Sequence, residues 1–333
     1  MTESPDFWIE IVTLALMAHG ARRENAETVA RYLVDAECQG LPGHGLSRVP
    51  SYCEQLDSGK VDGIVRPVVL PSRFSAATAV DAVGGFAYPA IELLTDQLLE
   101  RVNETGVAMG TVTRSHHFGA AGLWVERIAR RGSLALLLGN TPKAMAAPGG
   151  RDALIGTNPI AFAAPLGKDD PLIIDLALSS VPRARINRAR QRGEPIPADW
   201  AVDSEGQPTT DPEAALRGAL TAIGGPKGAA LALMVEILAA GLAGANFGFQ
   251  ASSFLDGEGA APHTGQWMLV MHPEAGAGHF EQRMRTLTRM FEDQPGVRLP
   301  GARRCANARR AAREGLDVDP ELADKLCHLG DVT

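Results

Sequence analysis

Two helix-rich ends enclose a strand-rich middle in this 333-residue chain, and this order constrains the fold more than any other feature. The first 60 residues carry apolar side chains at helical spacing, for example Ile9, Val12 and Leu16. From about residue 67 short apolar and branched runs predict strands, and residues 277–294 and 302–328 return to helical patterns. A chain of this length is expected to form about two domains. We therefore predict that the two ends meet in one domain and that the middle forms another.

Individual patterns predict the main elements. The expected strands include GVAMGTVTR, SLALLLGN, PLIIDLALSS and GQWMLVMHP, and the run 182–212 between the last two is polar and punctuated by proline and glycine. The expected helices cover residues 28–38, 46–56, 88–104 (ending near Gly106), 212–223 and 228–242.

Composition excludes several classes of protein. A net charge of −7 and a pI near 5.7 do not indicate a nucleic-acid binder. The four cysteines are scattered without a CxxC pair, so we expect no metal site, no disulfide framework and a reducing, cytoplasmic compartment. Glu10 interrupts the first apolar helix and Glu236 interrupts the most apolar segment, 229–244, so neither a signal peptide nor a membrane span is expected.

Common nucleotide and hydrolase motifs are absent from the sequence. It contains no GxGxxG after a strand and no GxxxxGK[ST], which disfavours a Rossmann enzyme and a P-loop ATPase. It also lacks HExxH and GxSxG.

The stretch GHGLSRVPSY (43–52) places His44, Arg48 and Tyr52 four residues apart behind two glycines. The three side chains share one face if a helix begins near Gly45. A histidine suits proton transfer near neutrality, and an arginine fork can hold a carboxylate. The spacing leaves a second interpretation open, in which the stretch is a capped helix with a surface histidine and arginine.

Three further stretches carry polar groups where strands and helices are predicted to meet. SHHFGAAGLW (115–124) puts two histidines before a helix whose first amides face outward, or is simply a cap with a packed histidine. PGGRDALIGTNPIAFAAP (148–165) is a loop whose amides can approach a ligand, or an ordinary connection. IIDLALSS (173–180) leaves a carboxylate near the end of a strand, where it can be structural or can orient a histidine.

Basic residues near glycines form the last group. AIGGPKGAALALMVE (222–236) places Lys227 at the start of an apolar helix, where a phosphate can bind. LPGARR (299–304) adds two arginines after a Pro-Gly turn, and PRARINRARQRG (182–193) holds five. Such runs are usually solvated faces, but the same charge would also suit an adenosine 2′-phosphate.

Taken in order, these motifs resemble the malate/L-lactate dehydrogenase family, whose members do not use a Rossmann fold. The resemblance covers nearly the whole chain, from GHGLSRVPSY and SHHFGAAG through IIDLALSS and WAVDSEGQPTTDP to GGPKGAALALMVEILAAGLAGANF and LPGARR. Within the family, VDAVGGFAYPA, HTGQWMLVMHPEAGAGHF and RLPGARR are similar to the Δ1-piperideine-2-carboxylate/Δ1-pyrroline-2-carboxylate reductases.

The resemblance implies a mixed α/β fold of the non-Rossmann L-sulfolactate/malate dehydrogenase type. Residues 1–70 and 263–333 would form a helix-rich substrate and dimerisation domain, and residues 71–262 an NAD(P)-binding domain. The implied cofactor is NADPH, with NADH as the alternative, and the implied partners are a small carboxylate substrate and a second copy of the chain.

The resemblance also implies roles for single residues. His44 would be the acid/base, Asp175 would support it, and His117 would be the third catalytic residue. His117 matches a histidine in a pattern whose preceding Asn is His116 here. Arg48 would bind the substrate carboxylate, and Tyr52 and His116 would complete the substrate site. The cofactor would be lined by His117, Thr157, Asn158, Pro159, Asp175, Leu176, Ala177, Ser179, Lys227, Gly228, Gly301, Arg303 and Arg304.

One departure from the family pattern bears on the substrate, because Gly43 stands where the family usually has serine. The reaction we expect is NADPH-dependent reduction of a cyclic imine carboxylate to L-pipecolate or L-proline. The alternative is a 2-hydroxy-acid dehydrogenase of the malate or L-lactate type.

Overall fold

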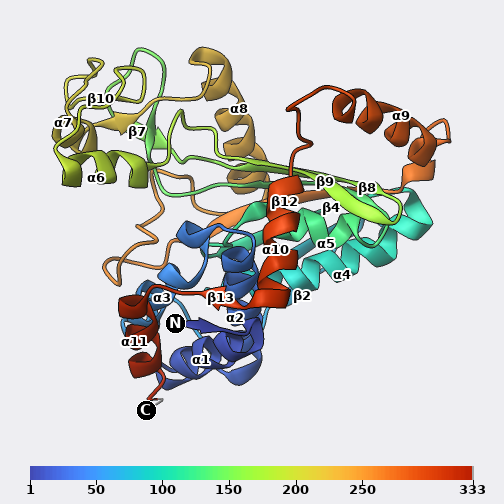
Figure 1. Ribbon diagram of the computed structural model, residues 1–333, viewed down its shortest axis with the longest axis horizontal. Helices are drawn as coiled ribbons and strands as arrows, with labels where there is room; N and C mark the ends of the chain where they lie inside the picture. Colours follow the sequence, from blue (N-terminus) through green and yellow to red (C-terminus); the bar gives the residue numbers. More distant parts are fainter. Residues whose placement is uncertain (332–333) are drawn as a thin grey trace.

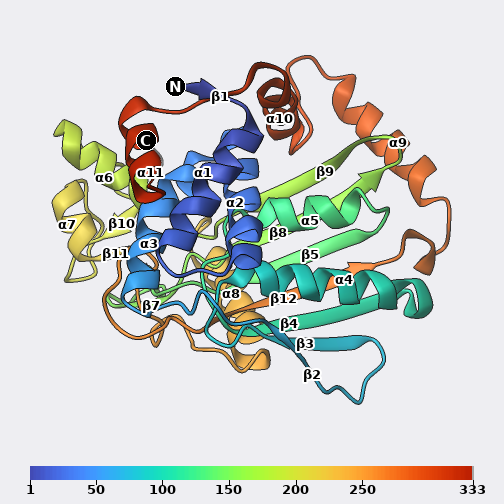
Figure 2. The same ribbon diagram turned by 90° about the horizontal axis from the view of Figure 1, so that it is seen from below.

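The computed structural model describes residues 1–331, and its largest element is a seven-stranded sheet (Figures 1 and 2). Within this sheet, as far as residues 1–331 describe it, only β3 and β4 pair in parallel, and the other neighbours are antiparallel. Such a sheet lacks the repeated βαβ crossovers of a Rossmann domain, and the prediction of a mixed, non-Rossmann α/β fold is confirmed. In spatial order the strands are β2 (Val68–Leu70), β3 (Ala77–Asp81), β4 (Val107–Ser115), β12 (Thr264–Met271), β5 (Leu134–Gly139), β8 (Ile160–Leu166) and β9 (Asp169–Leu176).

Helices α4 (Ala87–Thr105) and α5 (Ala121–Ala129) cover one face of this sheet (Figure 2). As predicted, α4 ends at Gly106, whose φ of 74° is a left-handed conformation that glycine adopts without a Cβ clash. The opposite face is covered only in part, by α8 (Pro226–Glu236) and the π-helical turn Ile237–Leu242 that continues it (Figure 1). Residues of β12 on this face, such as Trp267 and Leu269, are therefore half-buried.

The two ends of the chain pack together. Trp8, Leu33 and Leu326 share one hydrophobic core with Trp124 of α5, so this core extends to the helices on the sheet. The elements of the ends are β1 (Thr2–Glu3), α1 (Pro5–Ala18), α2 (Arg23–Cys38), α3 (Val49–Asp57), α10 (Ala302–Glu314), β13 (Leu316–Asp317) and α11 (Pro320–Leu329), with β1 paired to β13.

A smaller unit lies beyond one end of the large sheet (Figure 1). It has its own hydrophobic core, which includes Leu178, Ile186 and Ala232. Its sheet has the order β10 (Ala201–Val202), β11 (Ala219–Leu220), β6 (Met145–Ala146) and β7 (Ala153–Ile155), and its helices are α6 (Arg183–Arg192) and α7 (Pro212–Arg217). The remaining elements are α9 (Phe280–Glu292) and three 3-10 turns, Pro42–His44, Leu46–Arg48 and Pro273–Ala275.

Three differences from the predicted boundaries each add an element that was not predicted. The helix predicted over 212–223 ends at Arg217, because the chain then enters β11, and the helical run 302–328 is divided by β13. The polar run from 182 contains α6, whose single buried side chain, Ile186, left no apolar stripe to detect. No helix among residues 1–331 is long and apolar enough to cross a membrane.

The predicted division of the chain at 71 and 263 remains a prediction, but strand order bears on it. β12 belongs to the segment assigned to the terminal domain, yet it lies between β4 and β5 in the large sheet. A boundary based on packing would therefore fall after Met271.

Candidate active site

His44 and Arg48 lie on two consecutive 3-10 turns between α2 and α3. The carboxylate of Glu37 on α2 accepts a hydrogen bond from the Leu46 amide at 2.9 Å. The Nε of Arg48 donates to the carbonyl oxygen of Gly43 at 2.7 Å. The two side chains are therefore placed by the turns, and not by a shared face of one α-helix as their spacing had suggested.

The loop after β4 brings a second histidine to His44. Arg114, with a φ of 47°, bends the chain at this point and donates to Asp81 at 2.9 Å. Three residues on, the ring of His117 lies parallel to the ring of His44, with centroids 5.7 Å apart. Two stretches that are distant in sequence thus meet, as the resemblance implied.

Tyr52 lies behind these histidines with 0% of its surface exposed. Its hydroxyl is 2.5 Å from Nδ1 of His117 and 3.0 Å from the hydroxyl of Tyr88. This placement does not support the expected direct contact of Tyr52 with substrate, because both neighbours of the hydroxyl are protein groups. No sequence pattern predicts this position of Tyr88, because a tyrosine in the first turn of an apolar helix gives no separate signal.

His116 is also enclosed, with 1% exposure and no hydrogen-bond partner for either ring nitrogen among residues 1–331. Aromatic rings lie around it, with centroid distances of 5.4 Å to Phe254, 5.8 Å to Tyr52 and 6.0 Å to Phe86. Burial, and to a lesser degree the charge of Lys60, lower the pKa of His116 to about 3. Its imidazole is therefore neutral at physiological pH. Phe254 lies on a loop that gave no sequence signal.

Asp175 joins three parts of the fold. Its Oδ2 accepts a hydrogen bond from the Gly122 amide at 3.0 Å, at the start of α5, and from Nη1 of Arg304 on α10 at 2.7 Å. A Cβ on Gly122 would lie 2.6 Å from that Nη1, so only glycine leaves room for the ion pair. Among residues 1–331 no hydrogen bond links Asp175 to His44, so the predicted support can act only through the charge of the carboxylate.

His44 is exposed at the mouth of this site, yet its pKa is lowered to about 4. The largest cause is desolvation by the surrounding protein, followed by the positive charge of Arg48, while Asp175 opposes the shift and Arg304 adds to it. His44 is therefore neutral near pH 7 and able to accept a proton. Arg48 has no carboxylate partner among the described residues, which leaves its charge free for a ligand.

The predicted cofactor residues adjoin one another across four segments. Leu178 donates its amide to the Thr157 carbonyl at 2.8 Å and accepts from the Ile223 amide at 2.9 Å, and the Ile173 amide donates to the Pro300 carbonyl at 3.3 Å. These hydrogen bonds connect four segments into one continuous strip along the site, from α8 to α10. We call this strip the border; it consists of residues 157–159, 175–179, 226–228 and 301–304. On it Leu176, Lys227 and Arg303 are exposed, Pro159, Ala177 and Gly301 are half-buried, and Gly228 is buried.

Two of these residues have side chains turned inward. Asn158 is 0% exposed, and its Nδ2 donates to Oε2 of Glu236 at 2.7 Å and to the Ala232 carbonyl at 3.0 Å. The Oγ of Ser179 donates to the Val181 carbonyl at 2.9 Å. The structure does not support a side-chain contact between either residue and a cofactor, because both stabilise the loops that carry them.

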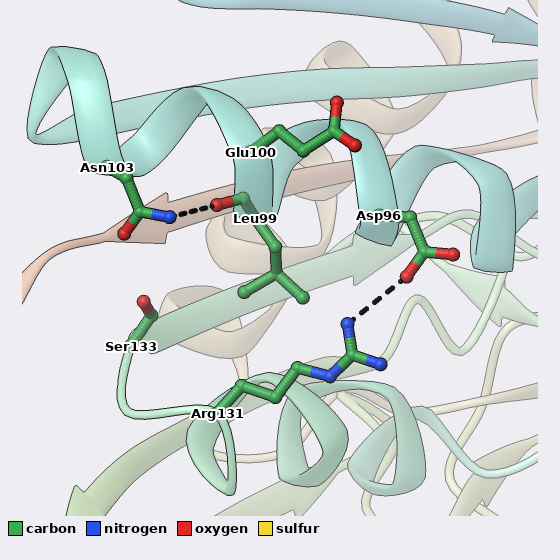
Figure 3. Close-up of a pocket in the computed structure, with 6 residues that line it drawn as sticks. All are labelled: Asp96, Leu99, Glu100, Asn103, Arg131 and Ser133. Atoms are coloured by element: carbon green, nitrogen blue, oxygen red, sulfur yellow. Dashed lines mark hydrogen bonds and ion pairs between the residues drawn. The ribbon is translucent and has the colours of Figure 1, made fainter.

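A separate depression lies between α4 and the turn after α5 (Figure 3). Asp96 and Arg131 pair across it at 3.4 Å, and the Asn103 side chain donates to the Leu99 carbonyl at 3.0 Å. It contains none of the predicted site residues, and its one arginine, Arg131, is already paired with Asp96. We therefore place the site at His44.

A histidine beside a free guanidinium can bind a small carboxylate and exchange a proton with it, and the bordering segments are open to an extended ligand. The family model described as malate/L-lactate dehydrogenase matches residues 5–327, so the chain belongs to that family. This membership confirms the prediction of an NAD(P)H-dependent oxidoreductase.

Three relatives illustrate the similarity. The chain is 47% identical over 318 residues to the (2R)-3-sulfolactate dehydrogenase (NADP(+)) of Chromohalobacter salexigens, covering 95% of this chain and 94% of the relative. It is 39% identical over 325 residues to the Δ1-pyrroline-2-carboxylate/Δ1-piperideine-2-carboxylate reductase of Pseudomonas syringae, covering 96% and 94%. The crystal structure of a Δ1-piperideine-2-carboxylate reductase from P. syringae superposes with a TM-score of 0.93 at 36% identity, covering 99% of both chains.

Proposed function

We propose that the chain is an NADPH-dependent oxidoreductase that interconverts a 2-hydroxy acid and its 2-oxo acid, with 3-sulfolactate as the first substrate to test. The observation that carries the proposal is the unpaired guanidinium of Arg48 beside His44. The relative at 47% identity supports this substrate class over the cyclic imine that we expected from sequence.

In this scheme Arg48 binds the substrate carboxylate and His44 exchanges a proton with the oxygen on C2. NADPH, when bound, supplies the hydride that reaches C2. In the oxidative direction the neutral His44 accepts the hydroxyl proton. In the reductive direction a bound carboxylate offsets the charge of Arg48, which raises the pKa of His44 and favours the protonated form that donates.

The border from α8 to α10 fits the phosphates of a dinucleotide. Gly224 and Gly225 both have a φ of 62°, and a Cβ at either position would meet nothing within 4 Å, so their backbone is open to a ligand. They precede α8, whose first amides and exposed Lys227 favour a phosphate. Lys227 and the exposed Arg303 would hold the phosphates of NADPH, and Leu176 and Ala177 would line the nucleotide. NADP(+) in the name of the 47% relative supports NADPH over NADH.

The cyclic imine carboxylate remains a second candidate. Of the two arginines near His44, Arg304 is paired with Asp175 and only Arg48 is free, which suits a substrate with one carboxylate. Phe254 lies beside both His116 and His117 and would suit an apolar ring. The reductase at 39% identity supports this substrate, and the proton would then go to the ring nitrogen.

A substrate panel tests the proposal. Initial rates of NADPH and NADH oxidation would be measured with sulfopyruvate, pyruvate, oxaloacetate and Δ1-piperideine-2-carboxylate. We expect sulfopyruvate with NADPH to give the highest kcat/KM by about tenfold or more. A higher value for the imine would favour the second candidate, and no turnover of any substrate would contradict the proposal.

We also propose that the chain forms a homodimer, through the partly open sheet face and not through the terminal domain that the resemblance implied. On that face α8 and its π-helical turn expose Leu231, Leu233, Met234 and Ile237 beside half-buried Trp267. A contiguous apolar surface of this kind is typical of an interface. Light scattering should give twice the chain mass, and Leu233→Glu should shift this mass to that of the monomer. A monomeric parent would contradict the proposal.

A cytoplasmic location is supported by the four unpaired cysteines.

A further inference from the structure

A buried chain of hydrogen bonds leads away from His117. The hydroxyl of Tyr52 lies 2.5 Å from Nδ1 of His117 and 3.0 Å from the hydroxyl of Tyr88. Both tyrosines are 0% exposed, so solvent cannot complete their hydrogen bonding. Each proton in this chain must therefore be donated to one of the three groups or remain unpaired.

The number of hydroxyl and imidazole protons fixes the direction in which these hydrogen bonds are donated. If Tyr88 donates to Tyr52 and Tyr52 donates to Nδ1 of His117, both hydroxyl protons have acceptors. In the reverse direction, Nδ1–H donates to Tyr52 and Tyr52 donates to Tyr88. The hydroxyl proton of Tyr88 is then left without an acceptor, since Tyr52 is its only hydrogen-bond partner among residues 1–331. The first direction is therefore favoured, and the proton of a neutral His117 must be on Nε2.

The second ring nitrogen of His117 remains available to a ligand. Nε2 has no hydrogen-bond partner among the described residues, but unlike both nitrogens of His116 it is not a fully enclosed atom. The ring that carries it lies parallel to that of His44. We propose that Tyr88 and Tyr52 hold His117 as its Nε2–H tautomer, and that this N–H donates a hydrogen bond to an oxygen of the bound substrate.

The same chain of hydrogen bonds prevents His117 from transferring a proton. Loss of the Nε2 proton would draw the Tyr52 proton to Nδ1 and then the Tyr88 proton to Tyr52, leaving a buried tyrosinate. Burial raises the pKa of Tyr52 to about 12 and that of Tyr88 well above 10, and it lowers the pKa of His117 well below 6.5. His44 moves the proton, His117 holds the substrate oxygen, and the two tyrosines are positioning residues. The substrate contact rests on the proposed function; the tautomer does not.

The tautomer can be measured on the unmodified protein without substrate. Two-dimensional ¹H–¹⁵N correlation through the imidazole carbons of ¹⁵N-histidine-labelled protein distinguishes Nε2–H, Nδ1–H and doubly protonated rings, and His117→Gln identifies the signal by its loss. We expect Nε2–H at pH 7. An Nδ1–H or doubly protonated ring would overturn the proposal, whereas failure of every substrate would affect only the proposed function.

Tyr52→Phe and Tyr88→Phe form a matched pair of variants. Tyr52→Phe removes the partner of Nδ1, so the ¹⁵N shifts of His117 should move toward a mixture of tautomers and kcat/KM should fall about tenfold. Tyr88→Phe leaves Tyr52 able to donate, so it should keep the tautomer and lose less than about threefold. The pH profile set by His44 should stay in place in both. Unchanged His117 signals and kcat/KM in folded Tyr52→Phe would contradict the proposal.

Discussion

Asp175 and Arg304 form an ion pair, 2.7 Å between Oδ2 and Nη1, that joins the end of β9 to α10 across 129 positions of the chain. Their charges act on His44 in opposite directions, because the carboxylate raises its pKa and the guanidinium lowers it. The pair therefore holds two parts of the fold together and also helps to set the protonation of His44.

Asp175→Asn should separate the two directions of the reaction. Without the carboxylate, the pKa of His44 falls further, so the protonated form needed for reduction becomes rarer at pH 7 while the neutral form needed for oxidation stays dominant. We expect reductive kcat/KM to fall about tenfold and oxidative kcat/KM by less than about threefold. Arg304→Gln should shift the pH profile the opposite way. Equal losses in both directions for Asp175→Asn would show that its charge does not act on His44.

Gly122→Ala should destabilise the protein although alanine is ordinarily the better helix residue. Relief of the backbone entropy of glycine contributes about 0.4–1 kcal/mol in favour of alanine. Here the new Cβ would lie 2.6 Å from Arg304 Nη1 and 2.9 Å from Asp175 Oδ2, so the ion pair must move. We expect a net loss of about 1–3 kcal/mol by urea unfolding. Gly43→Ala is the control, since nothing lies within 4 Å of its Cβ, and equal stability of the two variants would contradict the prediction.

Arg48→Met should weaken substrate binding. The variant removes the free cation beside His44 and leaves the length of the side chain nearly unchanged. We expect KM for the preferred substrate to rise about 10- to 100-fold. Arg48→Lys should restore part of the loss, because it returns the charge without the two-pronged geometry. A KM within about twofold of the parent for Arg48→Met would exclude the carboxylate contact.

Three histidines should make stability fall in acid. The pKa values of His44, His116 and His117 all lie below 6.5 in the folded state, chiefly because of desolvation, so the unfolded chain binds protons first as the pH decreases. Their contribution is fully present above about pH 6.5 and is lost progressively below it, down to about pH 4 for His44 and to about pH 3 for His116. The two buried histidines, His116 and His117, can each add up to about 1.4 kcal/mol per pH unit to the pH dependence of the unfolding free energy, and the exposed His44 adds less because solvent screens its charge.

One variant can show how much of this pH dependence of the unfolding free energy comes from His116. In His116→Asn the free energy of unfolding should depend less steeply on pH between 6.5 and 4 than in the parent, as measured by urea unfolding at several pH values. His272→Asn is the control, because that histidine lies at the far end of β12, outside the cluster. An unchanged slope in His116→Asn would show that His116 is not held neutral.

The positions of helices and strands, and the motifs that form the site, can be predicted from the sequence where they depend on neighbouring residues. The left-handed Gly106 ends α4, and the motifs around His44, His117 and Asp175 do meet. What sequence could not give is the direction in which a side chain points. Asn158 and Ser179 occupy the expected cofactor border, yet their polar atoms bind neighbouring loops.

The position of Tyr52 shows the same limit. Its spacing from His44 and Arg48 predicts one helical face, but 3-10 turns precede α3. The tyrosine therefore enters the core while the other two lie at the site. Its partner Tyr88 comes from another helix, and such a pairing depends on tertiary packing.

Removal of His44 tests most directly the claim that this histidine exchanges the proton. The kcat/KM of His44→Gln would be compared with that of the parent in both directions, using the best substrate of the panel and a folded variant verified by circular dichroism. We predict a loss of about 100-fold or more in both directions. A loss within about threefold would contradict the claim.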